Sequence, residues 1–148
     1  MKREETVDHH IKASWHAVSR MYNQQAGKYD ITTSIGFVLL NINSETGTPA
    51  TKIAPMMGME ARSLTRMLKS MEAKGLICKK PDPDDKRSVR IFLTDKGKEK
   101  KEISRITVLT FNNIVRDRID AKKLATFFDV IGEINEIIEQ GNIYESNV

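Results

Sequence analysis

The 148-residue sequence lacks the features that mark secreted or membrane proteins. It contains one cysteine, so no disulfide can form within a single chain, and this fits a reducing cytoplasm. No apolar run is long enough to cross a bilayer, and residues 1–6 are polar, unlike the start of a signal peptide. With 39% hydrophobic and 30% charged residues, the composition predicts a globular cytoplasmic protein that does not contact a membrane.

Sequence motifs for catalysis are also missing. The chain has no Gly-rich phosphate-binding loop, no G-x-S-x-G motif and no pair of carboxylates at a spacing that suggests an active-site pocket. Asp82, Asp84 and Asp85 lie close together, but the glycine and the distal glutamate of a calcium-binding EF-hand loop are absent. We therefore expect a protein that is not an enzyme, with no catalytic residue and no cofactor.

The net charge of +4 is unevenly distributed along the chain. Residues 60–90 contain nine Lys or Arg against five Asp or Glu, whereas residues 119–148 contain two against six. The first segment therefore carries +4 and the last −4. A basic middle segment indicates binding to phosphate groups, and the acidic end is expected to face away from nucleic acid.

Residues 60–77 contain the most informative pattern. Leu64, Leu68 and Met71, with Met67 beside them, recur at three- and four-residue spacing and predict a helix with one apolar face. The opposite face is basic and rich in hydroxyls, and it comprises Arg62, Ser63, Arg66, Lys69 and Ser70. Arginine can bind guanine through two hydrogen bonds, while lysine and short hydroxyls suit phosphate oxygens. Taken alone, the pattern favours an ordinary solvated helix face with scattered arginines.

The segments on either side favour a winged helix-turn-helix. Residues 51–59 predict a short helix, with Gly58 suited to a tight turn, and Gly75 is placed to end the helix that follows. The sequence then predicts a basic β-hairpin, with a strand over residues 76–78, a rigid proline-containing loop over 81–85 and a returning strand over 89–93. A helix for the major groove followed by a basic hairpin is how a winged helix holds DNA.

These residues resemble the MarR family of bacterial transcription regulators. The matching segments are Ile53-Ala54, Gly58-Met59, Ser63-Leu64-Thr65-Arg66, residues 72–77, residues 82–88 and the Leu-Thr-x-x-Gly sequence of residues 93–97. Two positions depart from the family pattern. Pro55 lies inside the first helix of the motif, which we expect to start late or bend, and Glu60 stands where the family usually has a capping serine.

The resemblance implies a mainly α fold with a small β-hairpin wing, in one domain over residues 1–148. Residues 31–93 would form the winged-helix lobe, and residues 1–30 and 94–148 a helical dimerisation lobe. The partner would be double-stranded DNA containing an inverted repeat. The residues expected to contact it are Thr51, Lys52, Arg62, Ser63, Thr65, Arg66, Lys69, Ser70, Asp85, Lys86, Arg87, Ser88 and Arg90.

Apolar periodicity predicts four further helices. The first carries Val7 to Tyr22, the second Ile35 to Ile42, a long third begins at Thr94, and Asp120 caps the last. The last helix has nearly a heptad seam, with little in its own domain to cover it. We expect a homodimer whose interface includes Val7, Ile11, Ile114, Leu124, Phe127, Phe128, Ile131, Ile134 and Ile138. The alternative is that the last helix folds back on its own chain.

Other candidate sites are weaker. Family resemblance implies a crevice for a small aromatic or phenolic effector, and the residues that could line it, or could equally be packing, are Trp15, His16, Tyr22, Tyr29 and Phe37. His9, His10 and His16 cluster without completing a zinc ligand set, so we expect no metal, although a metal-sensing regulator is an alternative. Cys78 is expected to be a small buried hydrophobic residue.

The function predicted is a homodimeric repressor that binds a palindromic operator. The main rival is a winged helix used for protein contacts, which would have no salt-dependent DNA affinity. An RNA-binding protein is disfavoured, because no aromatic residues alternate with the basic ones.

Overall fold

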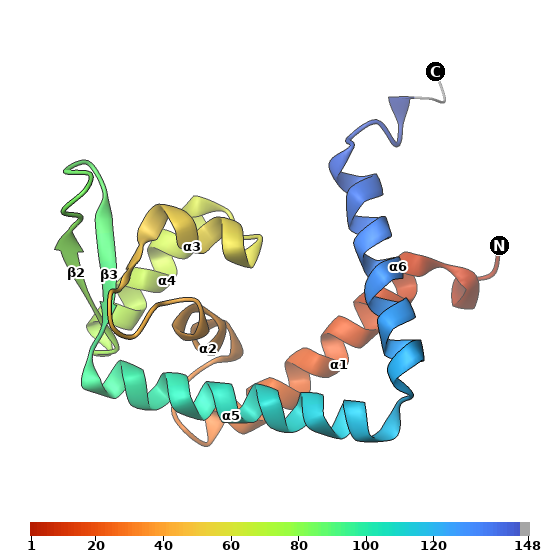
Figure 1. Ribbon diagram of the computed structural model, residues 1–148, viewed down its shortest axis with the longest axis horizontal. Helices are drawn as coiled ribbons and strands as arrows, with labels where there is room; N and C mark the ends of the chain where they lie inside the picture. Colours follow the sequence, from red (N-terminus) through yellow and green to blue (C-terminus); the bar gives the residue numbers. More distant parts are fainter. Residues whose placement is uncertain (146–148) are drawn as a thin grey trace. The chain divides into compact units, whose positions relative to one another are not determined.

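A computed structural model describes residues 1–145 of the chain (Figure 1). The elements in order are the 3-10 turn η1 (Arg3–Glu5), α1 (Val7–Gly27), α2 (Thr33–Leu40), β1 (Thr48–Pro49), α3 (Ala50–Met57), α4 (Ala61–Ala73), β2 (Ile77–Pro81), β3 (Val89–Leu93), α5 (Asp95–Arg118) and α6 (Ala121–Glu139). The mainly α fold with a small antiparallel sheet agrees with the prediction. No helix within the described residues is both long and apolar enough to pass through a membrane.

The chain divides into two compact units, Met1–Thr107 and Val108–Val148, and helix α5 runs across the boundary. This geometric division differs from the predicted lobes, which divide the chain at residues 30/31 and 93/94. Those lobes describe expected functions, so they stay a prediction. The two units are described separately below.

The first unit has its core between α2, α3, α4 and the sheet. Its largest fully buried side chains are Leu39, Ile42, Ile53, Met71, Leu76, Ile91 and Val38. The predicted apolar face of α4 is confirmed, because Leu64, Leu68 and Met71 are all buried in this cluster and Met67 is packed against it. The periodicity of the sequence thus located the inner face of this helix correctly.

The sheet has three strands in the order β1-β3-β2, all antiparallel. The prediction missed β1, a two-residue strand whose Thr48 pairs with Ile91. It also ended the first hairpin strand too early, because β2 continues to Pro81, which pairs with Val89. Pro81 is tolerated there because β2 is an edge strand. Its outer side has no neighbouring strand, so a missing N–H on that side breaks no hydrogen bond of the sheet.

Helix α3 contains Pro55 without losing the helix-turn-helix. The expectation of a late start was wrong, because the helix already begins at Ala50. The proline falls within its second half. A proline there lacks an N–H for the helical ladder, but only two helical residues follow it. Gly58 then takes a left-handed conformation with φ of 61°, and Met59 N–H donates to the Ala54 carbonyl at 3.0 Å. The predicted glycine turn is confirmed.

The Leu-Thr-x-x-Gly sequence joins the end of α4 to the start of α5. Thr94 Oγ1 accepts the N–H of Gly97 at 3.0 Å and donates to the carbonyl of Gly75 at 2.6 Å. A Cβ on Gly97 would collide with the backbone carbonyl of Leu76, so only glycine allows the two segments to approach this closely. Thr94 therefore caps α5, which begins at Asp95, one residue after the predicted start, and holds it against the exit of α4.

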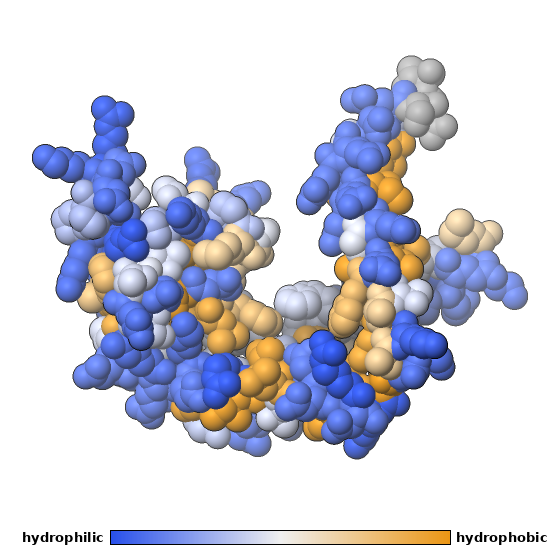
Figure 2. Space-filling view, viewed as in Figure 1, coloured by the Kyte–Doolittle hydropathy of each residue, from blue (hydrophilic) through white to orange (hydrophobic). Residues whose placement is uncertain are grey.

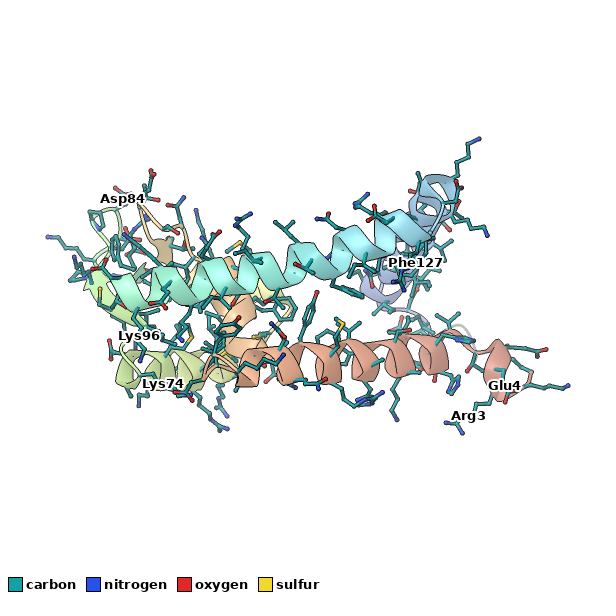
Figure 3. The ribbon with its side chains drawn as sticks, turned by 90° about the horizontal axis from the view of Figure 1, so that it is seen from below. Arg3, Glu4, Lys74, Asp84, Lys96 and Phe127 are labelled. Atoms are coloured by element: carbon teal, nitrogen blue, oxygen red, sulfur yellow. The ribbon has the colours of Figure 1, made fainter. Side chains whose placement is uncertain are left out.

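Three lysines of α5 extend this attachment. Their ammonium groups donate to backbone carbonyls at or just beyond the C-terminal ends of α4, α1 and α2, where such acceptors are unsatisfied by the helix itself. The pairs are Lys96 to Lys74 at 3.0 Å (Figure 3), Lys100 to Tyr29 at 2.7 Å and Lys101 to Ile42 at 2.6 Å. A positive charge at a helix C-terminus is also favoured by the helix dipole.

The second unit comprises the end of α5 and helix α6. The predicted cap is confirmed, because Asp120 accepts the N–H of Lys122 at 3.2 Å. Leu124 is buried, but Phe127, Phe128 and Ile138 are 55%, 53% and 58% exposed. Figure 2 shows apolar side chains gathered along α6. Within its own unit, this helix leaves much of its apolar seam uncovered.

Candidate nucleic-acid interface

The outer face of α4 is cationic and exposed to solvent in the described chain. Every predicted contact residue on it is exposed, namely Arg62, Ser63, Thr65, Arg66, Lys69 and Ser70. Thr65 Oγ1 donates to the Ala61 carbonyl at 2.9 Å, which is an ordinary bond inside a helix. Among residues 1–145, no acidic side chain forms an ion pair with Arg62, Arg66 or Lys69. Their charges are therefore available to an external anion.

The two ends of α4 are formed by backbone bonds. At the N-terminus the Glu60 carbonyl accepts the N–H of Leu64 at 3.2 Å, while the Glu60 side chain makes no capping bond. At the C-terminus Gly75 has φ of 73°, and Leu76 N–H donates to the Met71 carbonyl at 3.0 Å. The predicted role of Gly75 is confirmed. Thr51 and Lys52, the predicted contacts on α3, are exposed.

The loop between β2 and β3 is a tight turn built on aspartates. Asp85 Oδ1 accepts the N–H of Arg87, and Asp82 Oδ1 accepts the N–H of Asp84, both at 2.9 Å. The two carboxylates therefore hold the backbone of the loop in which the basic residues of the wing lie. Lys86 and Arg87 are exposed and form no ion pair within the described chain. Both can therefore reach a partner at the end of the hairpin.

Two other predicted wing contacts lie in less accessible positions. The hydroxyl of Ser88 is buried and finds no hydrogen-bond partner among the described residues, so it does not face solvent. The Arg90 guanidinium donates to the carbonyls of Thr46 and Gly47 and lies beside Asp82. To touch DNA, it would have to break those contacts. The sequence did not reveal them, because Thr46 is 44 residues away.

The remaining lysines of the hairpin already have partners. Lys79 lies 4.0 Å from Glu72 of α4, and the Lys80 ammonium lies 5.1 Å from the centre of the Phe92 ring. Half-exposed pairs of this kind are weak and compete with other anions. Within the described residues of α4 and the hairpin, Arg62, Arg66, Lys69, Lys86 and Arg87 therefore remain without an ionic partner.

The predicted effector residues are only partly brought together. Tyr22 is buried and packs edge-on against Phe37, with ring centres 5.9 Å apart, and burial raises the pKa of its phenol. Trp15, His16 and Tyr29 are exposed. The packing alternative fits Tyr22 and Phe37, while the crevice predicted from family resemblance stays a prediction.

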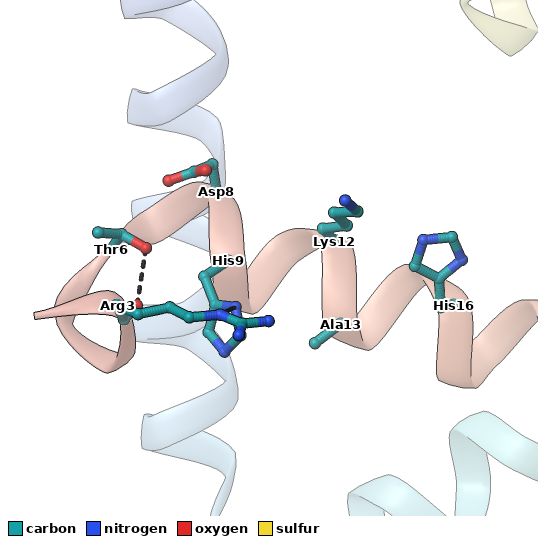
Figure 4. Close-up of a pocket in the computed structure, with 7 residues that line it drawn as sticks. All are labelled: Arg3, Thr6, Asp8, His9, Lys12, Ala13 and His16. Carbon is teal, nitrogen blue, oxygen red and sulfur yellow. Dashed lines mark hydrogen bonds between the residues drawn. The ribbon is translucent and has the colours of Figure 1, made fainter.

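The histidines near the N-terminus all lie on α1, and Figure 4 shows His9 and His16 among the residues that line a pocket at the start of this helix. His9 Nδ1 accepts from Arg3 Nε at 3.2 Å, and His10 Nε2 donates to the Glu4 carbonyl at 2.7 Å. Within residues 1–145, no three side chains of the His, Cys, Asp or Glu type are grouped so that they could hold a metal ion. Cys78 is only half-buried, opposite Phe92, whereas the sequence suggested a buried position.

Known proteins share both the sequence pattern and the fold. The model of the MarR family matches residues 31–89. The transcriptional regulator SarZ of Staphylococcus saprophyticus is 31% identical over 110 residues, which cover 72% of this chain and 75% of SarZ. The chain belongs to the MarR family. Its members are HTH-type transcriptional regulators and not enzymes, as the sequence predicted.

Two further similarities extend this result. The regulator TtmR of Methylorubrum extorquens is 34% identical over 88 residues, which cover 60% of this chain but only 45% of TtmR, so the similarity spans just under half of that protein. The solved structure of the S. aureus MepR–DNA complex has a TM-score of 0.81 and 18% identity, and covers 88% of this chain and 97% of MepR. At that identity the MepR similarity shows the winged-helix fold alone.

Proposed function

We propose that this MarR-family chain is a homodimeric repressor that binds an inverted-repeat operator in double-stranded DNA. The observation that carries the proposal is the cationic face of α4, where Arg62, Arg66 and Lys69 are exposed and have no ionic partner among residues 1–145. An α-helix fits the major groove, where arginine can distinguish guanine by its O6 and N7 atoms. The DNA held by MepR supports the same use of this fold.

The wing adds a second contact. Lys86 and Arg87 extend from a turn that Asp85 shapes, and neither has an ionic partner in the described chain. In this proposal they reach the neighbouring minor groove or its phosphates, where positive charge and groove width matter more than base identity. The helix then selects the sequence and the wing strengthens the attachment.

Dimerisation is supported by the apolar faces that each unit leaves uncovered. Val7 and Ile11 of α1, Ile114 of α5 and Phe127 of α6 are all exposed. Exposed apolar side chains in such numbers mark an interface. In the proposed dimer, residues 1–30 and 94–148 form the dimerisation lobe, and two copies of α4 read half-sites about one helical turn, roughly 34 to 36 Å, apart.

Release by a small aromatic or phenolic effector completes the proposal. Its support is the family resemblance together with the aromatic pair Tyr22 and Phe37 at the junction of α1 and α2. Adding p-hydroxybenzoate and related phenols to the protein–DNA complex tests it, with DNA release as the expected result. If no phenol releases DNA at millimolar concentration, this part of the proposal fails while the DNA-binding part stands.

Sequencing of the genomic DNA that the purified protein retains tests the main proposal. The expected result is enrichment of a palindromic site, and a labelled duplex of that site should bind more tightly than a shuffled duplex. Enrichment of a site without a dyad would contradict the dimeric mode. The absence of any enriched DNA would favour a winged helix that contacts proteins.

A further inference from the structure

Arg90 connects the wing to a segment outside the hairpin. Its Nη1 donates to the carbonyl oxygens of Thr46 at 3.1 Å and Gly47 at 3.4 Å, and its Nε lies 3.5 Å from Asp82 Oδ2. The Asp82 side chain is 5% exposed and that of Arg90 is 19% exposed. Because both charges are largely removed from water, each depends on the other for its neutralisation.

Asp82 in turn shapes the start of the wing loop. Its N–H donates to the Ser88 carbonyl at 3.1 Å, and its Oδ1 accepts the N–H of Asp84 at 2.9 Å. Within the part of the chain that the structure describes, the hydrogen bonds and ion pairs of residues 82–88 all stay inside the hairpin, and it is Arg90, the partner of Asp82, that binds outside it. The route from Asp82 through Arg90 to the 46–47 turn is therefore the polar attachment of the wing loop to the rest of the unit.

The 46–47 turn is a firm anchor for this attachment. Asn43 Oδ1 accepts the N–H groups of Glu45 and Thr46, each at 2.9 Å. Gly47 has φ of 68°, and a Cβ there would meet the backbone oxygen of Ile91 and the ring of Phe92. A turn held by side-chain bonds and pressed against β3 has little freedom to move, so it can fix the group that binds to it.

We propose that Arg90 is a positioning residue, which sets the direction of the wing loop and does not itself touch DNA. The proposal rests on the proposed function, because it assigns the DNA contact to Arg87 at the tip of the wing. If Arg90 turned toward a phosphate, it would leave the Asp82 carboxylate buried without a counter-charge. Arg90 therefore acts on DNA only through Arg87, whose guanidinium has no ionic partner among residues 1–145.

A double-mutant cycle on operator binding separates positioning from contact. Arg87→Ala and Arg90→Gln should each weaken binding by about tenfold, the value of one charge-assisted bond. If Arg90 acts through Arg87, the combined variant should bind no more weakly than the weaker single variant. If the two factors multiply, giving about a hundredfold loss, Arg90 makes its own contact and the proposal is overturned.

Hydrogen exchange of the DNA-free protein gives an independent readout. Arg90→Gln should speed exchange of the Asp82, Asp84 and Arg87 amides, whereas Arg87→Ala should leave them unchanged. Unchanged exchange in Arg90→Gln overturns the positioning role. If the wild-type protein binds no DNA, the proposed function fails, and the exchange result still decides whether Arg90 holds the wing.

The Asp82→Asn/Arg90→Gln variant controls for unfolding. It removes both charges of the pair together, so no buried charge is left without its partner. It should keep a cooperative melting transition while its wing amides exchange faster. If this variant also loses the whole winged helix, Arg90 stabilises the core and does not position the wing, which overturns the proposal.

Discussion

Helices α4 and α6 are both amphipathic, yet they leave opposite faces uncovered. Helix α4 buries Leu64, Leu68 and Met71 in its own unit and exposes its cations, whereas α6 exposes Phe127 and Phe128. Since the apolar face of α4 is already satisfied, its outer face is free to serve recognition. The apolar face of α6 is the one that still lacks cover. In the proposed function, the first helix binds DNA and the second mediates self-association.

Truncating the buried face of α4 should have the largest effect. Leu68→Ala removes a side chain from a closed core, and this costs roughly 2 to 5 kcal/mol of unfolding free energy. Phe128→Ala on α6 is the comparison variant, and its cost should depend on protein concentration, because a dimer is stabilised by mass action. Urea denaturation at two protein concentrations measures both. A concentration-independent loss for Phe128→Ala would remove the contrast between the helices.

Adding a charge to the exposed face of α6 should disrupt assembly. Phe128→Glu would place a carboxylate in the proposed seam, so the dimer of the 16.8 kDa chain should give way to monomer or aggregate. Thr126→Glu adds the same charge on the opposite side of α6, at another exposed position, and should leave the dimer intact. Light scattering at micromolar concentration decides the matter. A wild-type monomer that still binds its operator would contradict the dimer proposal.

Removing a cation from the exposed face of α4 should change selectivity. Arg66→Ala would remove a base contact worth roughly 1 to 3 kcal/mol and weaken discrimination at one base pair of each half-site. Arg105 is a control, because it is also exposed but already binds Glu102 at 2.6 Å. Arg105→Ala should leave DNA affinity unchanged. Titrations on cognate and singly substituted duplexes test this, and full selectivity in Arg66→Ala would refute the assignment.

Removing the cation at the tip of the wing should have the smallest effect on selectivity. Arg87→Ala should weaken binding to cognate and unrelated duplexes by the same factor, because a minor-groove or phosphate contact depends little on base identity. The ratio of the two dissociation constants is the quantity to measure. A change in that ratio, or no loss of affinity on either duplex, would contradict the role given to the wing.

Local patterns in the sequence were sufficient to predict most of the helices. The inner face of α4, the glycine turns at Gly58 and Gly75 and the cap at Asp120 all depend on residues within a few positions of one another. Periodicity and capping rules capture such short-range effects directly. The same rules identified the exposed cations of α4, because a helix that buries one face exposes the other.

Long-range contacts could not be predicted in the same way. Strand β1 is two residues long and exists because it pairs with β3, which lies more than 40 residues further along the chain. The hydrogen bond from Arg90 to Thr46 also joins residues that are far apart in the sequence. The sequence around Arg90 therefore suggested a wing cation that is free to contact DNA. The bonds of Lys96, Lys100 and Lys101 to backbone carbonyls also join segments that are far apart in the sequence. Contacts between residues that are far apart in the sequence produce no periodic pattern from which they could be predicted.

The salt dependence of DNA binding tests the central claim most directly. Each phosphate that the protein neutralises releases counterions, and contributes roughly −0.9 to the slope of log K against log salt concentration. Because α4 and the wing both present unpaired cations, a dimer should touch several phosphates, and affinity should fall steeply and linearly between about 50 and 200 mM salt. A flat response would contradict DNA binding by this surface and assign the winged helix to protein contacts.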